Sequence, residues 1–389
     1  MKNVPAYLFS KLFTVETLDQ DNDYICFATE YHLNCHLFQH MSIHTVSKII
    51  GQYEISQGFK ENDLRSLIND SNISWIQLSS PLTEKEIDTL ENVVFSQRSD
   101  ITLRIYGHYK DECNLSFLRR LPSLRKVTVD CLMNAKGIEV VTELNNLETL
   151  GVGIFDLDNF DFLNEINPNL KQLHLHQTKS KKPSIGAIAR FAQLEELYLE
   201  AQSKGIESIN SLKKLQAVTL RSISTPNVDY LKGLEQLWSV DIKLGGIRDF
   251  NSLKSLQSLK YLELWQVREL SDISFISDLT SLQNLFIQSL ANVEELPSLE
   301  KLYKLKRIYL ENLKGLKKLD ALRTAPSLTE FIYVLAQSQE PENLLPALEN
   351  KNVESVFCMF GSSKKNNRFK ELSDKFGKSQ YKHHKFLYQ

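Results

Sequence analysis

The sequence lacks the features that mark membrane, secreted and strongly charged proteins. No stretch of its 389 residues approaches the ~18 consecutive apolar residues that a transmembrane helix needs. Residues 1–20 contain neither a continuous apolar run nor a small-residue cleavage site, so we expect no signal peptide. The 46 Lys and Arg residues nearly balance the 48 Asp and Glu residues, which gives a formal net charge of −2. The whole chain therefore offers no charge excess for binding nucleic acid or an anionic membrane.

Cysteines are few, and catalytic motifs are missing. The five cysteines form an odd and scattered set, at positions 26, 35, 113, 131 and 358. This usage predicts free thiols in a reducing, cytoplasmic compartment. The sequence has no phosphate-binding glycine loop, Gly-x-Ser-x-Gly elbow, HExxH motif or CxxC pair, and no set of nucleophile, base and orienting group. We therefore predict neither an enzyme nor a bound cofactor.

What the sequence does contain is a repeat. The pattern L-x-x-L-x-x-L-x-L recurs, for example as LPSLRKVTV, LQSLKYLEL and LYKLKRIYL. The first residue of the closing L-x-L pair lies at positions 127, 150, 173, 197, 218, 240, 262, 285, 308 and 331. A period near 23 residues that persists over ten copies is the signature of a solenoid.

The apolar spacing within one repeat predicts its backbone. Between Val293 and Leu322 an apolar residue recurs every third position, apart from one step of two between Ile308 and Leu310. A step of three matches the 3₁₀-helix, and a step of two matches a strand. Each repeat is therefore predicted to form one coil of strand, turn, short helical return and turn. A single coil cannot bury its apolar side, so neighbouring coils must stack.

These residues resemble those of leucine-rich repeat proteins, in particular the internalin-like class with repeats of 22–23 residues. The resemblance implies an α/β solenoid with a curved parallel sheet on its concave face and short 3₁₀ or α segments on its convex face. The family places Asn three residues after the L-x-L pair, where the amide ties coils together. Here those positions hold other residues: Leu132, Phe155, Thr178, Gln202, Ile223, Gly245, Val267, Leu290 and Leu313. We expect apolar packing, or a different turn, to replace the amides.

The repeats predict three regions. Residues 1–72 would form an N-terminal capping subdomain of mixed α and β structure, 73–360 the solenoid, and 361–389 a C-terminal capping helix and basic tail. The sequence favours a capping helix followed by a solvated tail. The alternative is that the basic tail contacts an acidic partner or nucleic acid.

Histidines suggest two further sites. His32, His36, His40 and His44 recur every four residues near Cys26 and Cys35, a composition that suits zinc. Their spacing matches no standard zinc pattern, so the sequence favours a surface stripe over a metal or regulatory site. On the predicted sheet, His174 and His176 would lie beside Glu196 and Glu200. This group could bind metal or titrate, although a solvated polar patch is the favoured reading.

Strand alternation predicts a partner-binding face. If Leu262 and Leu264 face the core, then Tyr261, Glu263 and Trp265 face the concave side. The same rule applied along the chain gives a set that is rich in aromatics and Arg, the residue types that dominate interface energetics. The predicted partner-binding residues are Tyr198, Arg221, Tyr261, Glu263, Trp265, Phe286, Arg307, Tyr309 and Glu311.

The resulting prediction is a non-catalytic scaffold that binds a protein partner on the concave face. Cross-strand packing of the aromatics on one another is the alternative for these residues. We expect no small-molecule substrate and no membrane. Metal binding in the N-terminal cap and nucleic-acid binding through the basic tail remain the alternative functions.

Overall fold

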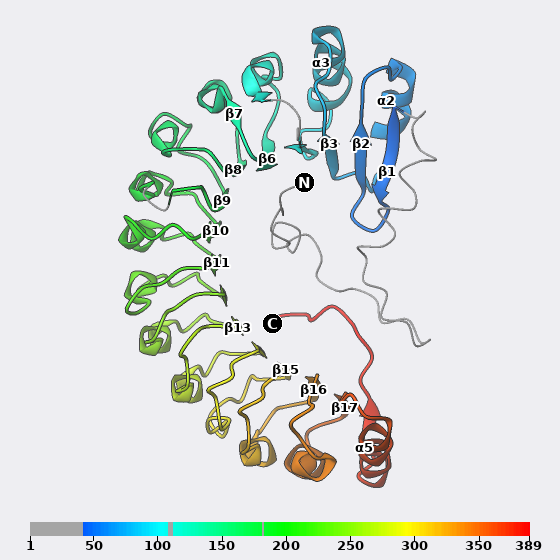
Figure 1. The fold of residues 1–389 in the computed structure, drawn as a ribbon, viewed down its shortest axis with the longest axis vertical. Coiled ribbons are helices and arrows are strands. Elements are labelled where there is room, and N and C mark those ends of the chain that lie inside the picture. The colour runs from blue at the N-terminus through cyan, green and yellow to red at the C-terminus, as the bar shows by residue number, and fades with distance from the viewer. Residues whose placement is uncertain (1–41, 108–111, 181–182) are drawn as a thin grey trace. The chain divides into compact units, whose positions relative to one another are not determined.

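The computed structural model describes residues 42–107, 112–180 and 183–389 (Figure 1). They form two compact units. Unit 1 is built from the described residues up to Leu170 together with Thr178–Ser180, and unit 2 from 171–177 and the described remainder of the chain.

Unit 1 begins with an antiparallel pair and continues as a parallel sheet. Strand β1 (Ile43–Ser47) pairs antiparallel with β2 (Gln52–Ile55). The strands that follow in parallel are β3 (Trp75–Leu78), β4 (Thr102–Tyr106), β6 (Lys126–Leu132) and β8 (Thr149–Ile154), with a separate small pair of β5 (Cys113–Asn114) and β7 (Ala135–Lys136). Parallel pairing thus starts at β2, before the predicted start of the solenoid at residue 73.

Helical segments connect these strands, and they shorten along unit 1. The first are α2 (Glu61–Ile68), α3 (Glu84–Leu90) and the π turn η2 (Glu91–Phe95), followed by the 3₁₀ segments η3 (Leu115–Arg120), η4 (Ile138–Glu143) and η5 (Asp161–Asn164). Helix α3 begins at a capping box, in which the Thr83 hydroxyl accepts from the Glu86 N–H while the Glu86 carboxylate accepts from the Thr83 N–H.

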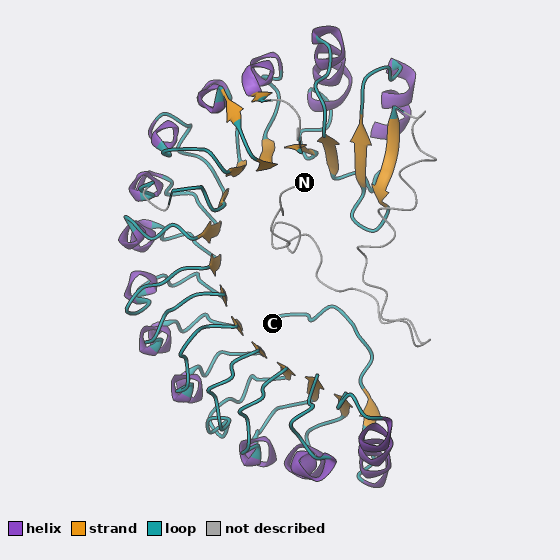
Figure 2. Ribbon diagram, viewed as in Figure 1, coloured by secondary structure: helices purple, strands orange, loops and turns teal. Residues whose placement is uncertain are grey.

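Unit 2 is a regular parallel stack. Its strands pair in chain order: β9 (Gln172–Leu175), β10 (Glu196–Glu200), β11 (Ala217–Arg221), β12 (Ser239–Lys243), β13 (Tyr261–Trp265), β14 (Asn284–Gln288), β15 (Arg307–Glu311), β16 (Glu330–Val334), β17 (Ser355–Cys358) and β18 (Ser379–Gln380). The returns are η6 (Gly186–Arg190), η7 (Ile206–Ser211), η8 (Asp229–Leu231), η9 (Asn251–Ser255), η10 (Ser274–Asp278), η11 (Asp320–Thr324), η12 (Pro341–Leu344), α4 (Leu345–Glu349) and α5 (Ser363–Lys375). Figure 2 shows these returns on one side of the unit and the strands on the other.

The three-residue apolar step is a 3₁₀ ladder, as the sequence predicts. Leu253 donates its N–H to Phe250 O at 3.0 Å, Leu256 to Leu253 O at 2.9 Å, and Leu259 to Leu256 O at 3.2 Å. All four side chains are buried. Each i to i−3 bond therefore brings the next apolar side chain onto the same line, which points into the core.

The corners that follow the strands explain how the coils close without the family's Asn. The residue after the strand adopts a left-handed conformation in seven coils, at Ala201, Ser222, Leu244, Gln266, Ser289, Asn312 and Leu335. At Gln266 φ is 49°, and its N–H donates to Gln288 O of the next coil at 2.8 Å. The following residue, Val267, is buried. A different turn and apolar packing thus both replace the amide. The residue equivalent to Val267 in the preceding coil is Gly245, and only glycine fits there because an added Cβ would lie 2.2 Å from Ile223 O.

The C-terminal end departs from expectation. Helix α5 buries Phe369 and Leu372 against the end of unit 2, and the Ser362 hydroxyl caps its N-terminus. The tail beyond Gln380 was expected to be solvated; six of its nine residues are exposed, but the segment also contacts the fold. The segment Tyr381–Gln389 turns back along the strands of the same unit (Figure 1), where aromatic and polar side chains hold it.

Candidate functional site on the inner face of unit 2

The face of the unit 2 sheet that points away from its core is called the inner face here. Leu262 and Leu264 are fully buried on the core side, so Tyr261, Glu263 and Trp265 lie on the inner face, as the alternation predicts. The parallel register aligns equivalent positions of neighbouring strands in rows. One row is Tyr261, Asn284, Arg307 and Glu330; the second is Glu263, Phe286, Tyr309 and Ile332; the third is Trp265, Gln288, Glu311 and Val334.

The earlier strands carry a ladder of ion pairs. Arg221 Nε lies 3.0 Å from Glu200 Oε1, and Lys243 Nζ lies 2.9 Å from both Asp241 and Glu263. Burial opposes the charge on Lys243, but these two carboxylates outweigh it and hold its pKa above the ordinary value. Two of these pairs join neighbouring strands, and the pair of Lys243 with Asp241 lies within β12.

Trp265 lies beside this ladder. The Arg221 guanidinium is 5.8 Å from the centre of its ring, and Lys243 Nζ is 5.5 Å from it. Both distances fall within the range of cation–π attraction. Phe286 and Tyr309, in the next two strands, meet edge to face with ring centroids 4.8 Å apart. The cross-strand packing considered as an alternative therefore occurs for this pair.

The histidine pair lies where the sequence places it. His174 Nε2 is 3.0 Å from Glu196 Oε1, and His176 Nδ1 is 3.4 Å from Glu200 Oε2. The Tyr198 ring packs against both imidazoles. Burial raises the pKa of Glu200, but His176 and Arg221 outweigh it and hold that pKa below its ordinary value.

The metal-binding alternative gains no support from the described part of the chain. No group of three or more His, Cys, Asp or Glu side chains there is arranged to hold a metal ion. His32, His36 and His40 lie outside the described residues, as do Cys26 and Cys35.

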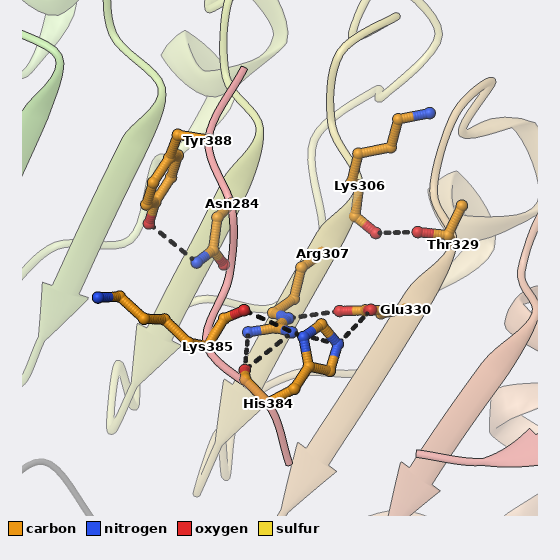
Figure 3. A network of polar contacts seen from close by, with 8 residues as sticks. All are labelled: Asn284, Lys306, Arg307, Thr329, Glu330, His384, Lys385 and Tyr388. Carbon is orange, nitrogen blue, oxygen red and sulfur yellow. Dashed lines mark hydrogen bonds and ion pairs between the residues drawn. The ribbon is translucent and has the colours of Figure 1, made fainter. Parts of the chain in front are cut away.

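At the C-terminal end of the inner face, the row that runs from Tyr261 to Glu330 is covered by the chain's own segment Tyr381–Gln389, which we call the tail. The Tyr388 ring lies 5.0 Å from that of Trp238 and 6.3 Å from that of Tyr261. Asn284 donates from Nδ2 to the Tyr388 hydroxyl at 3.2 Å (Figure 3). The tail thus packs against two aromatic rings and bonds to the amide on the strand that follows them.

Arg307 is the centre of the second set of tail contacts. It pairs through Nε with Glu330 at 2.5 Å, and its guanidinium lies 5.2 Å from the centre of the Tyr381 ring and 5.0 Å from that of Phe386. His384 Nε2 is 2.7 Å from Glu330 Oε1 and 2.9 Å from Arg307 Nη2 (Figure 3). This nitrogen can donate to the carboxylate or accept from the guanidinium, but not both at once. The tail therefore leaves Arg307 only 7% exposed.

The end of the tail is held by an amide. The Gln389 N–H donates to Gln283 Oε1 at 2.9 Å, and Gln283 Nε2 donates to Gln389 O at 2.8 Å. A glutamine side chain here makes the pair of bonds that a neighbouring strand would otherwise supply.

Of the predicted residues, Tyr261 and Arg307 contact the tail directly. Sequence reasoning missed Trp238, Gln283 and every tail residue. Trp238 and Gln283 immediately precede β12 and β14, so the alternation rule does not reach them. The aromatic residues Tyr381, Phe386 and Tyr388 could have indicated that the tail packs against the sheet. The prediction considered only the basic residues beside them.

The inner face of unit 1 carries a different group. Gln77 Nε2 donates to Glu54 at 2.7 Å, and the Tyr106 hydroxyl donates to the same carboxylate at 2.8 Å. Arg104 donates from Nη1 to Gln77 Oε1 at 3.2 Å and pairs through Nε with Asp130 at 2.8 Å. Burial and the Glu54 charge raise the pKa of Tyr106 well above its ordinary value. These side chains bond to one another across β2, β3, β4 and β6.

Comparison with known proteins establishes the fold. No protein-family model and no curated protein sequence matches the chain. Among solved structures, an internalin, InlF, from Listeria monocytogenes matches with a TM-score of 0.53 at 18% identity, over 79% of this chain and 87% of that one. The leucine-rich repeat protein LIC12759 from Leptospira interrogans matches with a TM-score of 0.48 at 17% identity, over 80% and 84%. The chain has the leucine-rich repeat fold, and the predicted resemblance to the internalin-like class is confirmed at the level of the fold.

Proposed function

We propose that the protein is a non-catalytic interaction scaffold whose inner face in unit 2 binds a protein partner. The observation that carries this proposal is that the face already holds a peptide segment, the tail, through ring contacts, cation–π contacts and side-chain hydrogen bonds. Arg and aromatic side chains concentrated on one sheet face form the kind of surface that dominates protein interfaces. The contacts involve Trp238, Tyr261 and Arg307, and the next rows add Trp265 and Tyr309.

We place the proposed scaffold in the cytoplasm. Cys113 and Cys358 are buried free thiols, and burial raises the pKa of Cys113 to about 11, so its thiol stays protonated and unreactive.

No helix in the described ranges is both long and apolar enough to cross a membrane.

The test is affinity capture with the intact chain and a Trp265→Ala, Tyr309→Ala variant. We expect the variant to stay folded and to lose its main partner by at least tenfold, because truncating two central aromatics typically costs more than ~2 kcal/mol of binding energy. Tyr303→Ala is the matched control, since Tyr303 is 70% exposed and lies outside the strands that form the inner face. Retention of the partner by the double variant would contradict the proposal.

A further inference from the structure

We propose that the tail is a displaceable internal ligand, and that the partner displaces it with an extended segment of the same aromatic and basic chemistry. This inference rests on the proposed function and adds the kind of segment that the inner face recognises. It follows from how the tail is held, what it covers and how little of it is buried.

The tail docks on unit 2 without joining its sheet. Tyr381 still makes a backbone bond, donating its N–H to Val356 O at 2.9 Å. From Lys382 onward, every contact between the described residues of the tail and the sheet involves a side chain: the rings of Phe386 and Tyr388, the imidazole of His384, the Arg307 guanidinium and the Gln283 amide. A segment held this way can leave without breaking a strand pairing.

The burial contrast points in the same direction. With the tail in place, the residues beneath it are buried, and Arg307 and Asn284 are 7% and 8% exposed. Every residue of the tail is at least partly exposed, and Leu387 is 80% exposed. The alternate residues His384, Phe386 and Tyr388 turn their rings toward the sheet, as expected for an extended chain that lies on a surface, while Leu387 points away.

Charge complements shape at this site. The tail sequence YKHHKFLYQ contains two lysines and two histidines and no acidic residue. The rows beneath and beside it contain Glu263, Glu311 and Glu330. His384 of the tail meets one of these carboxylates, with its Nε2 2.7 Å from Glu330 Oε1. An incoming segment with rings at alternate positions and cationic neighbours meets every one of these features.

Tethering then makes the tail a competitor. A segment joined to its site by a short linker acts at an effective concentration on the order of millimolar, so a free ligand binds only the fraction of molecules whose tail has left. Weakening the tail should increase the affinity for a free segment without any change in the site itself.

The experiment uses the full chain and a fluorescent peptide with the sequence of residues 379–389. We expect the variant with Phe386→Ala and Tyr388→Ala to bind the peptide at least tenfold more tightly than the unaltered chain. Leu387→Ala is the matched control, because its side chain faces away from the site, and it should bind as the unaltered chain does. Adding Arg307→Ala to the double variant should weaken peptide binding at least tenfold.

The same proteins supply a second measurement. Trp238 packs against Tyr388, so the double variant should show more acrylamide quenching of tryptophan fluorescence, and peptide should reverse it. Equal peptide affinity for the unaltered chain and the double variant, or no binding to the double variant, would overturn the inference. A concentration-dependent dimer that Tyr388→Ala abolishes would assign the tail to a second copy and would also overturn it. Because no natural partner is needed, this result is independent of the capture test.

Discussion

The inner face of unit 1 and the tail-covered end of the unit 2 inner face are built on the same strand alternation but differ in what their side chains contact. In unit 1 the positions that face away from the core carry Glu54, Gln77 and Arg104, which are buried and bond to one another. In unit 2 they carry rings and Arg307, which are satisfied by the tail. Polar groups that pair within a sheet leave nothing for a partner to complete, whereas flat rings remain available for stacking. The repeat thus positions the strands. The residues at alternate positions decide whether the side chains of a face bond to one another or remain available to a ligand.

The largest expected effect concerns the hydrophobic core beneath the inner face of unit 2. Leu262 is fully buried beneath the aromatic face. Leu262→Ala should lower the free energy of unfolding by ~2–5 kcal/mol, as truncations of buried Leu do. Chemical denaturation measures this change. A silent substitution would mean that the core and the inner face are assigned to the wrong sides.

A smaller effect tests whether the unit 1 face is closed by its own bonds. Arg104→Ala removes the partner of Asp130 and one donor to Gln77. Leaving these nearly buried groups without a partner should cost about 1–3 kcal/mol of stability. Arg125→Ala is the control, because its pair with Glu148 is solvent-exposed and should contribute less than ~1 kcal/mol. Equal losses for the two variants in denaturation experiments would refute this contrast.

Trp265→Ala should cost less again, about 0.5–2 kcal/mol, since what is lost is mainly the attraction between its ring and the cations of Arg221 and Lys243. The protein should remain folded by circular dichroism. Loss of the fold would show that this ring belongs to the core and not to the open face.

The smallest effect concerns pH. Burial raises the pKa of Glu311 above its ordinary value, the Gln288 amide opposes the rise, and the nearby Glu263 adds to it. The folded state then binds this proton more readily than the unfolded state. Glu311 therefore destabilises the fold at neutral pH, and the penalty is relieved as pH falls through the folded pKa toward the unfolded one. We expect Glu311→Gln to raise the thermal midpoint slightly at pH 7 and not at pH 4. An equal change at both values would argue against it.

The sequence predicted the coil and its sides because both follow from local spacing. The 3₁₀ line through Leu253 and Leu256 and the buried Leu262 and Leu264 are set within one repeat. Trp238 was not predicted because the alternation rule holds only inside a strand, and Trp238 lies one residue before β12. The docking of the tail was not predicted because its contact with Trp238 joins positions 150 residues apart. Such a contact depends on how the coils stack and not on any local sequence pattern.

The left-handed corners have a consequence for the length of the array. The N–H of Leu244 bonds to Trp265 O, and that of Gln266 bonds to Gln288 O, so each corner presents the next one with the same backbone group in the same place. Deletion of the 244–265 coil would join Lys243 to Gln266, which occupies the same corner position as Leu244. The corner N–H of each remaining coil would still find a backbone carbonyl on the next coil. The number of coils in such a protein can therefore change by whole units during evolution while the geometry of each junction persists.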